Sequence, residues 1–171
     1  MGIFLKDINL KGKTALITGA TKGLGRGAAQ AIAEAGGDII AIGRNQSELN
    51  SLAKVIKKLK VKYTSFNCDV NDYNKLKEFI TKLKKLDILV NNAGTNIPES
   101  FLNVKESSMK TILDVNTKAV FNVAQLCANQ IIKLRRKQGS IINISSIFGL
   151  VAGQNRTVYS MTKFGVEGLT R

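Results

Sequence analysis

The residues of this sequence best suited to acid–base chemistry are a tyrosine and a lysine four positions apart, Tyr159 and Lys163. In a helix, residues with this spacing lie on one face, a single turn from each other. A free phenol titrates near 10, and a neighbouring cation favours the phenolate. Such a pair can therefore exchange protons at neutral pH. Tyr-x-x-x-Lys alone is common on helix surfaces, so its meaning depends on the residues that accompany it.

The composition explains why a tyrosine would carry this chemistry. The sequence of 171 residues contains no histidine, which excludes Ser-His-Asp and Cys-His nucleophile pairs, HExxH metalloproteases and ordinary His-ligated zinc. The two cysteines, Cys68 and Cys127, are far apart in the sequence and form no CxxC motif. We therefore expect no metal site and no disulfide framework. Such cysteine usage fits a reducing compartment, and we expect a cytoplasmic protein.

A glycine-rich segment over residues 18–27 follows an apolar run and leads into an alanine-rich stretch. Glycines permit positive φ angles and a close approach of backbone N–H groups, and a helix N-terminus attracts an anion. Gly23, Gly25 and Ala28 match GxGxxG/A, while a GxxxGxG series starts at Gly19, directly after the predicted strand. We predict that this turn binds the pyrophosphate of a dinucleotide. A tight turn without a ligand is the alternative, and a Walker A loop is excluded because no Gly-Lys-Ser/Thr ends the segment.

The residues that follow the second predicted strand bear on the choice between NAD and NADP. An acidic residue there binds the ribose 2′-hydroxyl, whereas an arginine accommodates a 2′-phosphate. The strand ends just before Arg44, and the nearest carboxylates are Asp38 at its start and Glu48 in the next predicted helix. Arg44, helped by Lys22 in the glycine turn, would face the extra phosphate, so we predict NADP(H). NAD(H) bound through the main chain, beside a solvated Arg44, is the alternative.

Short β-branched runs alternate with amphipathic stretches along the chain, which predicts a parallel sheet covered by helices on both faces. The predicted strands are 14–18, 38–42, 62–67, 87–90 and 140–144. The predicted helices are 23–35, 47–59, 71–85, 105–114 and 116–136, with a last helix that begins near Val158. We therefore expect a single NAD(P)-binding domain over residues 1–171, with a Rossmann-type doubly wound parallel sheet in three α/β/α layers.

Five motifs stand in a fixed order along the chain: Thr18-Gly19-xxx-Gly23-x-Gly25, Asn91-Asn92-Ala93-Gly94, Asn116, Ser146 and Tyr159-xxx-Lys163. In order and spacing they resemble the motifs of the short-chain dehydrogenase/reductase family, and the likeness extends over essentially the whole chain. The family continues through further strands and helices after the point where this sequence stops at Arg171. We therefore expect a C-terminally incomplete fold that lacks the last strands.

The resemblance implies a role for each motif residue. Tyr159 donates or accepts the proton, while Lys163 supports it electrostatically and binds the cofactor ribose. Ser146, 13 residues before Tyr159, donates a hydrogen bond to the substrate carbonyl, and Ser145 ends the strand. Asn116 holds a water that connects Lys163 to solvent; by its residue type alone, it would cap or kink a helix.

The resemblance also implies cofactor contacts. It places Asn91 and Gly94 near the cofactor ribose and Asp69 at the adenine, although Asp69 could also cap the helix that follows it. The complete set of residues predicted to bind the cofactor is Gly19, Thr21, Lys22, Gly23, Leu24, Gly25, Arg44, Asp69, Val70, Asn91, Ala93, Gly94, Tyr159 and Lys163.

The net charge of +14 raises the question of a nucleic-acid or membrane partner. The lysines, however, are interleaved with leucine and isoleucine at helical spacing, which is typical of solvated helix faces. Because no aromatic residues alternate with them to stack on bases, we expect no nucleic-acid partner. We also expect no membrane partner, since no apolar segment is long enough to span a bilayer. The resemblance implies a homo-oligomer that pairs through two long helices.

The function predicted from these features is an NADP(H)-dependent oxidoreductase that transfers a hydride between the nicotinamide and a secondary alcohol or ketone. The resemblance extends to branches that include gluconate 5-dehydrogenase and related sugar-acid enzymes, and equally to 3-oxoacyl-[acyl-carrier-protein] reductases. A catalytically silent cofactor-binding module is a third possibility, against which the intact Ser-Tyr-Lys set argues.

Overall fold

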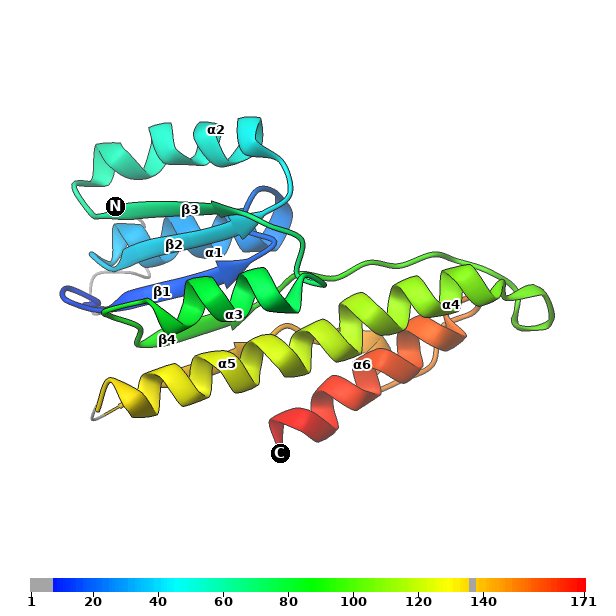
Figure 1. The fold of residues 1–171 in the computed structure, drawn as a ribbon. Coiled ribbons are helices and arrows are strands. Elements are labelled where there is room, and N and C mark those ends of the chain that lie inside the picture. Colours follow the sequence, from blue (N-terminus) through cyan, green and yellow to red (C-terminus); the bar gives the residue numbers. More distant parts are fainter. Residues whose placement is uncertain (1–7, 136–137) are drawn as a thin grey trace.

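The computed structural model describes residues 8–135 and 138–171 as a parallel sheet flanked by helices (Figure 1). The five strands are β1 (Thr14–Thr18), β2 (Asp38–Gly43), β3 (Tyr63–Asn67), β4 (Ile88–Asn91) and β5 (Ser140–Asn143). Their order in the sheet is β3-β2-β1-β4-β5, and each neighbouring pair is parallel. The chain thus builds outward from β1 to β3, then crosses back to add β4 and β5. This doubly wound order confirms the predicted Rossmann-type sheet.

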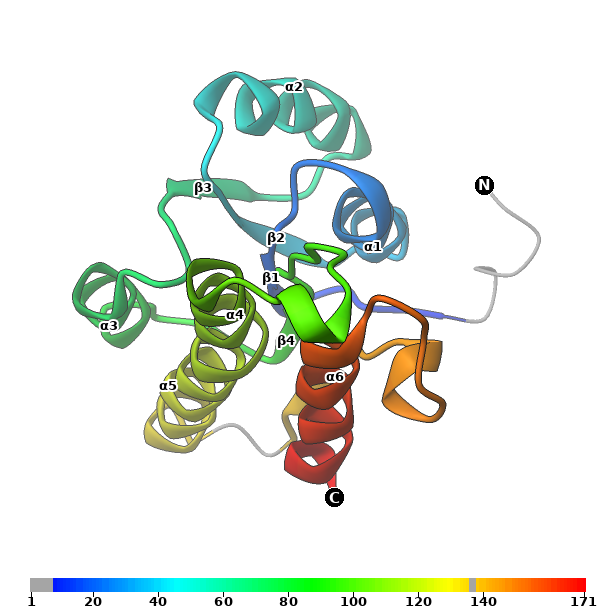
Figure 2. The same ribbon diagram turned by 90° about the vertical axis from the view of Figure 1, so that its right-hand side faces the viewer.

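The helices cover the two faces of this sheet, as Figure 2 shows. They are α1 (Gly23–Glu34), α2 (Gln46–Ile56), α3 (Tyr73–Thr81), α4 (Glu106–Leu113), α5 (Ala119–Lys133) and α6 (Thr157–Thr170). Short 3₁₀ segments are η2 (Lys57–Leu59), η3 (Phe101–Asn103) and η5 (Ile147–Gly149), and η4 (Asp114–Lys118) is a π-helix. Helices α1 and α2 pack on one face, whereas α3 and α5 pack on the other.

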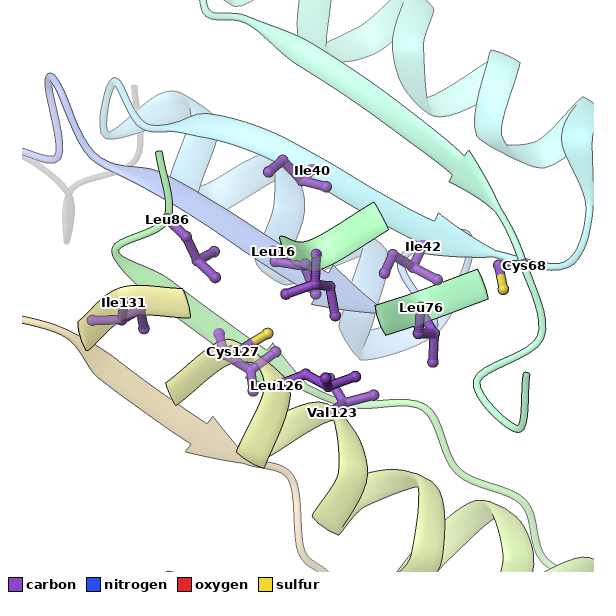
Figure 3. Close-up of a cluster of buried hydrophobic side chains, with 12 residues drawn as sticks. Leu16, Ile40, Ile42, Cys68, Leu76, Leu86, Val123, Leu126, Cys127 and Ile131 are labelled. Carbon is purple, nitrogen blue, oxygen red and sulfur yellow. The ribbon is translucent and has the colours of Figure 1, made fainter. Parts of the chain in front are cut away.

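Two apolar clusters hold these layers together, because successive residues of a strand point to opposite faces. On one face, Ala15 and Ile17 of β1 pack against α1 and α2. On the other, Leu16 meets residues of α3 and α5 (Figure 3). Both faces of the central strands are therefore apolar, which explains the nearly continuous hydrophobic runs in the sequence.

The ends of several helices differ from the prediction, and side-chain caps account for part of the difference. Helix α3 begins at Tyr73 rather than 71 because the carboxylate of Asp72 accepts a hydrogen bond from the backbone N–H of Lys75, as an N-cap does. The two helices predicted over 105–114 and 116–136 are joined by η4 into one helical run. The predicted end at Arg136 lies outside the described residues. None of the described helices is long and apolar enough to span a membrane.

Candidate active site

The glycine-rich turn follows β1 directly and has the conformation that its glycines predict. Gly19 and Gly23 adopt positive φ angles of +62° and +54°, which other residues rarely do. Gly19 is the first residue after the strand, as expected for the series that starts there. Helix α1 begins at Gly23, and its N-cap residue Lys22 provides no side-chain cap. The first N–H groups of this helix are thus left for another acceptor, which suits an anion.

Gly25 is required for packing rather than for a special backbone angle. A Cβ atom on Gly25 would lie 2.3 Å from the carbonyl oxygen of Gly19 and 2.4 Å from Nδ2 of Asn92. The Asn92 side chain donates hydrogen bonds to the carbonyl oxygens of Thr18 (3.0 Å) and Gly19 (3.2 Å). The hydroxyl oxygen of Thr18 accepts from the backbone N–H groups of Asn92 and Ala93, both at 3.0 Å. Hydrogen bonds therefore connect the turn after β1 to the end of β4.

A cavity of about 620 Å³ opens at the carboxyl ends of β1, β2, β3 and β4, where doubly wound sheets bind their ligands. Nine of the predicted cofactor residues line it: Gly19, Thr21, Lys22, Leu24, Arg44, Asp69, Val70, Ala93 and Gly94. The sequence analysis did not select the other lining residues, which are Ile42, Gly43, Asn45, Glu48, Cys68, Asn92, Thr95, Thr111 and Val115. Its size, its glycine turn and its uncapped helix N-terminus fit a dinucleotide.

The charges around this cavity are arranged in two pairs. The guanidinium of Arg44 lies 3.6 Å from the carboxylate of Asp69, and the ammonium of Lys22 lies 3.6 Å from that of Glu48. The sequence analysis found no carboxylate at the end of β2, but the fold brings two carboxylates there from α2 and from the loop after β3. Both cations expected to bind the 2′-phosphate therefore already have acidic partners.

The side chain of Asn91 does not line the cavity. Its side chain is buried and donates hydrogen bonds to the carbonyl oxygen of Val120 (2.8 Å) and to Oδ1 of Asn143 (3.2 Å). It thus joins β4 to α5 and β5 instead of lining the cavity. Strand alternation gives the reason, because Asn91 lies two positions after Leu89 and shares its face. Asn92, which was not predicted, is the asparagine whose side chain contacts the glycine turn.

Lys163 of α6 is buried, with its side chain directed toward the end of β4. Its Nζ donates a hydrogen bond of 2.7 Å to the carbonyl oxygen of Ile144 and lies 3.8 Å from the point where a Cβ of Gly94 would be. The same ammonium is 5.6 Å from the ring centroid of Tyr159, so the predicted pair does meet on one helix face. Burial lowers the pKa of Lys163 because it disfavours the charged form.

The segment that carries the two serines packs tightly on α6. Ser145 does not end the strand, because β5 stops at Asn143; its hydroxyl instead donates to the carbonyl oxygen of Lys163 at 3.3 Å. The hydroxyl oxygen of Ser146 accepts from the backbone N–H of Phe148 at 3.2 Å and caps η5. The ring of Phe148 meets the ring of Tyr159 edge to face, with 6.3 Å between centroids. Ser146, the N-cap residue of η5, and Tyr159 of α6 are thus held close to each other by these contacts.

Asn116 is buried in the π-helix η4 and connects three parts of the site. Its Oδ1 accepts from the backbone N–H of Thr95 (2.8 Å), while its Nδ2 donates to the carbonyl oxygen of Thr95 (2.8 Å) and to the hydroxyl of Thr162 (3.3 Å). By its residue type, Asn116 was expected to cap or kink a helix, and it lies in a π-helix, which is an irregular part of the helical run. π-Helices occur frequently at functional sites. Asn116 thereby links Thr95, which follows β4, to α6, the helix that contains Lys163.

A doubly wound parallel sheet with a glycine-rich turn, a cavity at the strand ends and a Tyr–Lys pair beside it defines the class of dinucleotide-binding α/β oxidoreductases. The chain belongs to the short chain dehydrogenase family, whose sequence pattern matches residues 13–171.

Comparison with individual proteins agrees with this assignment. The chain is 35% identical to a 3-oxoacyl-[acyl-carrier-protein] reductase of Thermotoga maritima, covering 96% of this chain and 68% of that protein. It is also 35% identical to a 2-dehydro-3-deoxy-D-gluconate 5-dehydrogenase of Bacillus subtilis, covering 100% and 67%. The chain thus spans about two thirds of the length of these relatives.

Solved structures show the same fold. A carveol dehydrogenase from Mycobacterium avium, in complex with NAD, superposes with a TM-score of 0.88 at 30% identity, covering 95% of this chain and 65% of that one. A protein from Agrobacterium tumefaciens described as a 2-deoxy-D-gluconate 3-dehydrogenase, with bound NADP, gives 0.88 at 30% identity, covering 96% and 65%. Both nicotinamide dinucleotides therefore occur in structures similar to this chain.

Proposed function

We propose that this chain is the cofactor-binding and catalytic part of an NADP(H)-dependent oxidoreductase that acts on a secondary alcohol or ketone. The observation that supports this most directly is the position of Lys163. Its ammonium lies beside Gly94, which lines the cavity, and also beside the ring of Tyr159. One buried cation therefore adjoins both the site for a dinucleotide and the proposed proton donor.

The proposed roles of the residues are those that the family resemblance implies, and their positions support them. When bound, the nicotinamide supplies or accepts the hydride. In the reducing direction, Tyr159 gives its proton to the forming alkoxide, and the hydroxyl of Ser146 donates a hydrogen bond to the same oxygen. Lys163 stabilises the phenolate left behind. Asn116, which holds Thr95 and Thr162 together, positions Lys163 and is the proposed site of a water that returns the proton.

A comparison of two tyrosine variants tests this proposal in the intact protein. We expect Tyr159→Phe to lower turnover of a ketone by about 10²- to 10⁴-fold, while NADPH still binds, because only the proton donor is removed. Tyr73→Phe at the exposed start of α3 is the control and should retain activity. Undiminished turnover in Tyr159→Phe would refute the assignment. Cofactor binding without turnover on any ketone in the wild type would favour a silent module.

The proposed cofactor preference rests on Arg44, which lines the cavity. We expect Arg44→Asp to weaken NADPH binding by at least about 10- to 100-fold, the range for the loss of one charge-assisted hydrogen bond. NADH binding should stay the same or strengthen, because an acidic residue at this position binds a ribose 2′-hydroxyl. Fluorescence titration of both cofactors measures this, and Arg135→Asp after α5 controls for net charge. An unchanged NADPH/NADH preference would contradict the role of Arg44.

Two substrate classes are proposed. A sugar acid is the first, since relatives include a 2-dehydro-3-deoxy-D-gluconate 5-dehydrogenase. A 3-oxoacyl thioester is the second, and one feature of the structure favours it: Ile147, Leu150 and Val151 are exposed directly after Ser146, so an apolar acyl chain would find contacts beside the carbonyl site. Turnover rates on a 5-keto sugar acid and on a 3-oxoacyl thioester separate the two.

We further infer a homo-oligomer in a reducing compartment such as the cytoplasm. Helix α5 exposes Phe121 and Ile132, and α6 exposes Phe164, so these long helices offer apolar surface to a second copy. Both cysteines are buried and free. Sedimentation of the intact protein would test the first inference, and monomers at micromolar concentration would contradict it.

A further inference from the structure

The glycine-rich turn after β1, which carries Lys22, is hydrogen-bonded to the end of β2, which Arg44 follows. The backbone N–H of Ala20, in the turn after β1, donates a hydrogen bond of 3.1 Å to the carbonyl oxygen of Ile42 in β2. A Cβ on Gly43 would lie only 2.6 Å from Cγ2 of Thr21, so only a glycine fits there without a shift. Because of these contacts, the residue that follows Thr21, namely Lys22, is held near the start of α2.

Glu48 lies in the first turn of α2, where its backbone N–H donates to the N-cap residue Asn45 at 3.1 Å. In the usual capping box, the glutamate at this position returns the bond to the N-cap N–H. In the described part of the chain, no such return bond is formed. Glu48 instead lines the cavity, and its carboxylate lies 3.6 Å from the ammonium of Lys22. A helix-capping role therefore accounts for the backbone of Glu48 but not for its carboxylate.

We propose that Glu48 is a specificity-determining residue, which lowers the preference for a 2′-phosphorylated cofactor by holding the Lys22 ammonium as its counter-ion. This inference rests on the proposed function, in which the cavity binds a nicotinamide dinucleotide. To bind the Lys22 ammonium, a 2′-phosphate must first break the ion pair between Lys22 and Glu48. A ribose 2′-hydroxyl carries no charge and does not compete for this ammonium. The ion pair therefore opposes binding of NADPH and leaves binding of NADH unchanged.

The size of the effect follows from the exposure of the pair. The Lys22 side chain is 81% exposed and that of Glu48 is 34% exposed, so solvent screens their attraction. Pairs of this kind change an equilibrium by about two- to fivefold. We therefore expect Glu48→Gln to raise the ratio of NADPH affinity to NADH affinity by that factor, and the gain to shrink as salt concentration rises.

The experiment measures dissociation constants of the intact protein for NADPH, NADH, adenosine 2′,5′-bisphosphate and adenosine 5′-monophosphate. The two adenosine nucleotides test the 2′-phosphate without nicotinamide or turnover. Glu34→Gln, at the exposed far end of α1, removes the same charge away from the cavity and should leave the ratio unchanged. Thermal unfolding of each variant verifies that α2 remains folded.

A double-mutant cycle then tests whether Glu48 acts through Lys22. In a Lys22→Met background, Glu48→Gln should no longer raise the preference, since no ammonium remains to be released. A full effect in that background would overturn the proposal, as would an unchanged ratio in Glu48→Gln alone or an equal change in Glu34→Gln. Weaker NADH binding in Glu48→Gln would also overturn it, because the carboxylate would then be a ribose ligand. If the wild type binds none of the four nucleotides, the proposed function itself fails.

Discussion

A single methyl group added at Gly25 should disrupt the contact between the glycine turn and β4. The new Cβ would lie 2.3 Å from the carbonyl oxygen of Gly19, whereas ordinary contacts begin at 3.4 Å. Helix α1 or the turn must therefore move by about 1 Å. Overpacking of this kind costs about 1–3 kcal/mol. The two hydrogen bonds from Asn92 to Thr18 and Gly19 are strained at the same time, at about 1 kcal/mol each.

The helix propensity of alanine offsets about 1 kcal/mol of this loss, so we expect Gly25→Ala to lower the free energy of unfolding by about 2–4 kcal/mol. For a domain of this size, the melting temperature then falls by about 4–16 °C. Gly27, two residues further along the same helix, provides a matched control because a Cβ there would meet no atom within 4 Å. Gly27→Ala should therefore stabilise the protein by up to about 1 kcal/mol.

Urea unfolding followed by circular dichroism measures both changes, and NADPH titration adds a second readout. Gly25→Ala should bind NADPH more weakly, because the turn that we propose binds the pyrophosphate would shift, while Gly27→Ala should bind as the wild type does. If the two variants were equally stable, close packing would not be the reason for glycine at position 25, and the reasoning above would be wrong.

Two further predictions concern buried groups. Asn116→Ala should lower the free energy of unfolding by roughly 2–4 kcal/mol, because the backbone N–H and carbonyl of Thr95 lose their partner; a loss below about 0.5 kcal/mol in urea unfolding would contradict this. Burial raises the pKa of the Cys127 thiol from 9.0 to about 12. Between these values the unfolded chain releases a proton that the folded one keeps, so this group makes stability fall as pH rises, by about 1.4 kcal/mol per pH unit. Stability measured from pH 8 to 11 should fall less steeply in Cys127→Ala, and parallel curves would refute the assignment.

The strands were predictable because a buried parallel strand is a short apolar run bounded by polar or glycine residues. Each observed strand agrees with its predicted range to within about one residue at either end. Helix ends were less predictable, since they depend on individual caps such as Asp72. The joining of α4 and α5 through η4 was missed although no glycine or proline interrupts the sequence between them. The reason is that Asn116 alone does not show whether a helix breaks or continues.

The directions of the side chains in the candidate site were predictable for some residues and not for others. The spacing of Tyr159 and Lys163 indicated one helix face, and the structure places their side chains together. The resemblance placed Asn91 near the cofactor ribose, and strand alternation after Leu89 indicates that its side chain points toward α5. Asn92 lies beyond the end of β4, where that alternation no longer applies, so its contact with the glycine turn required the fold.

The sequence by itself determined the fold class, the glycine-rich turn after β1 and the Tyr–Lys pair, because each depends on residues close together in the chain, whose periodicity and backbone freedom are local properties. Only the tertiary structure decided which charges share the cavity at the strand ends. Glu48 and Asp69 reach Lys22 and Arg44 because parallel strands bring all their carboxyl ends to one edge of the sheet. The spacing of residues along the sequence does not show which side chains meet at that edge.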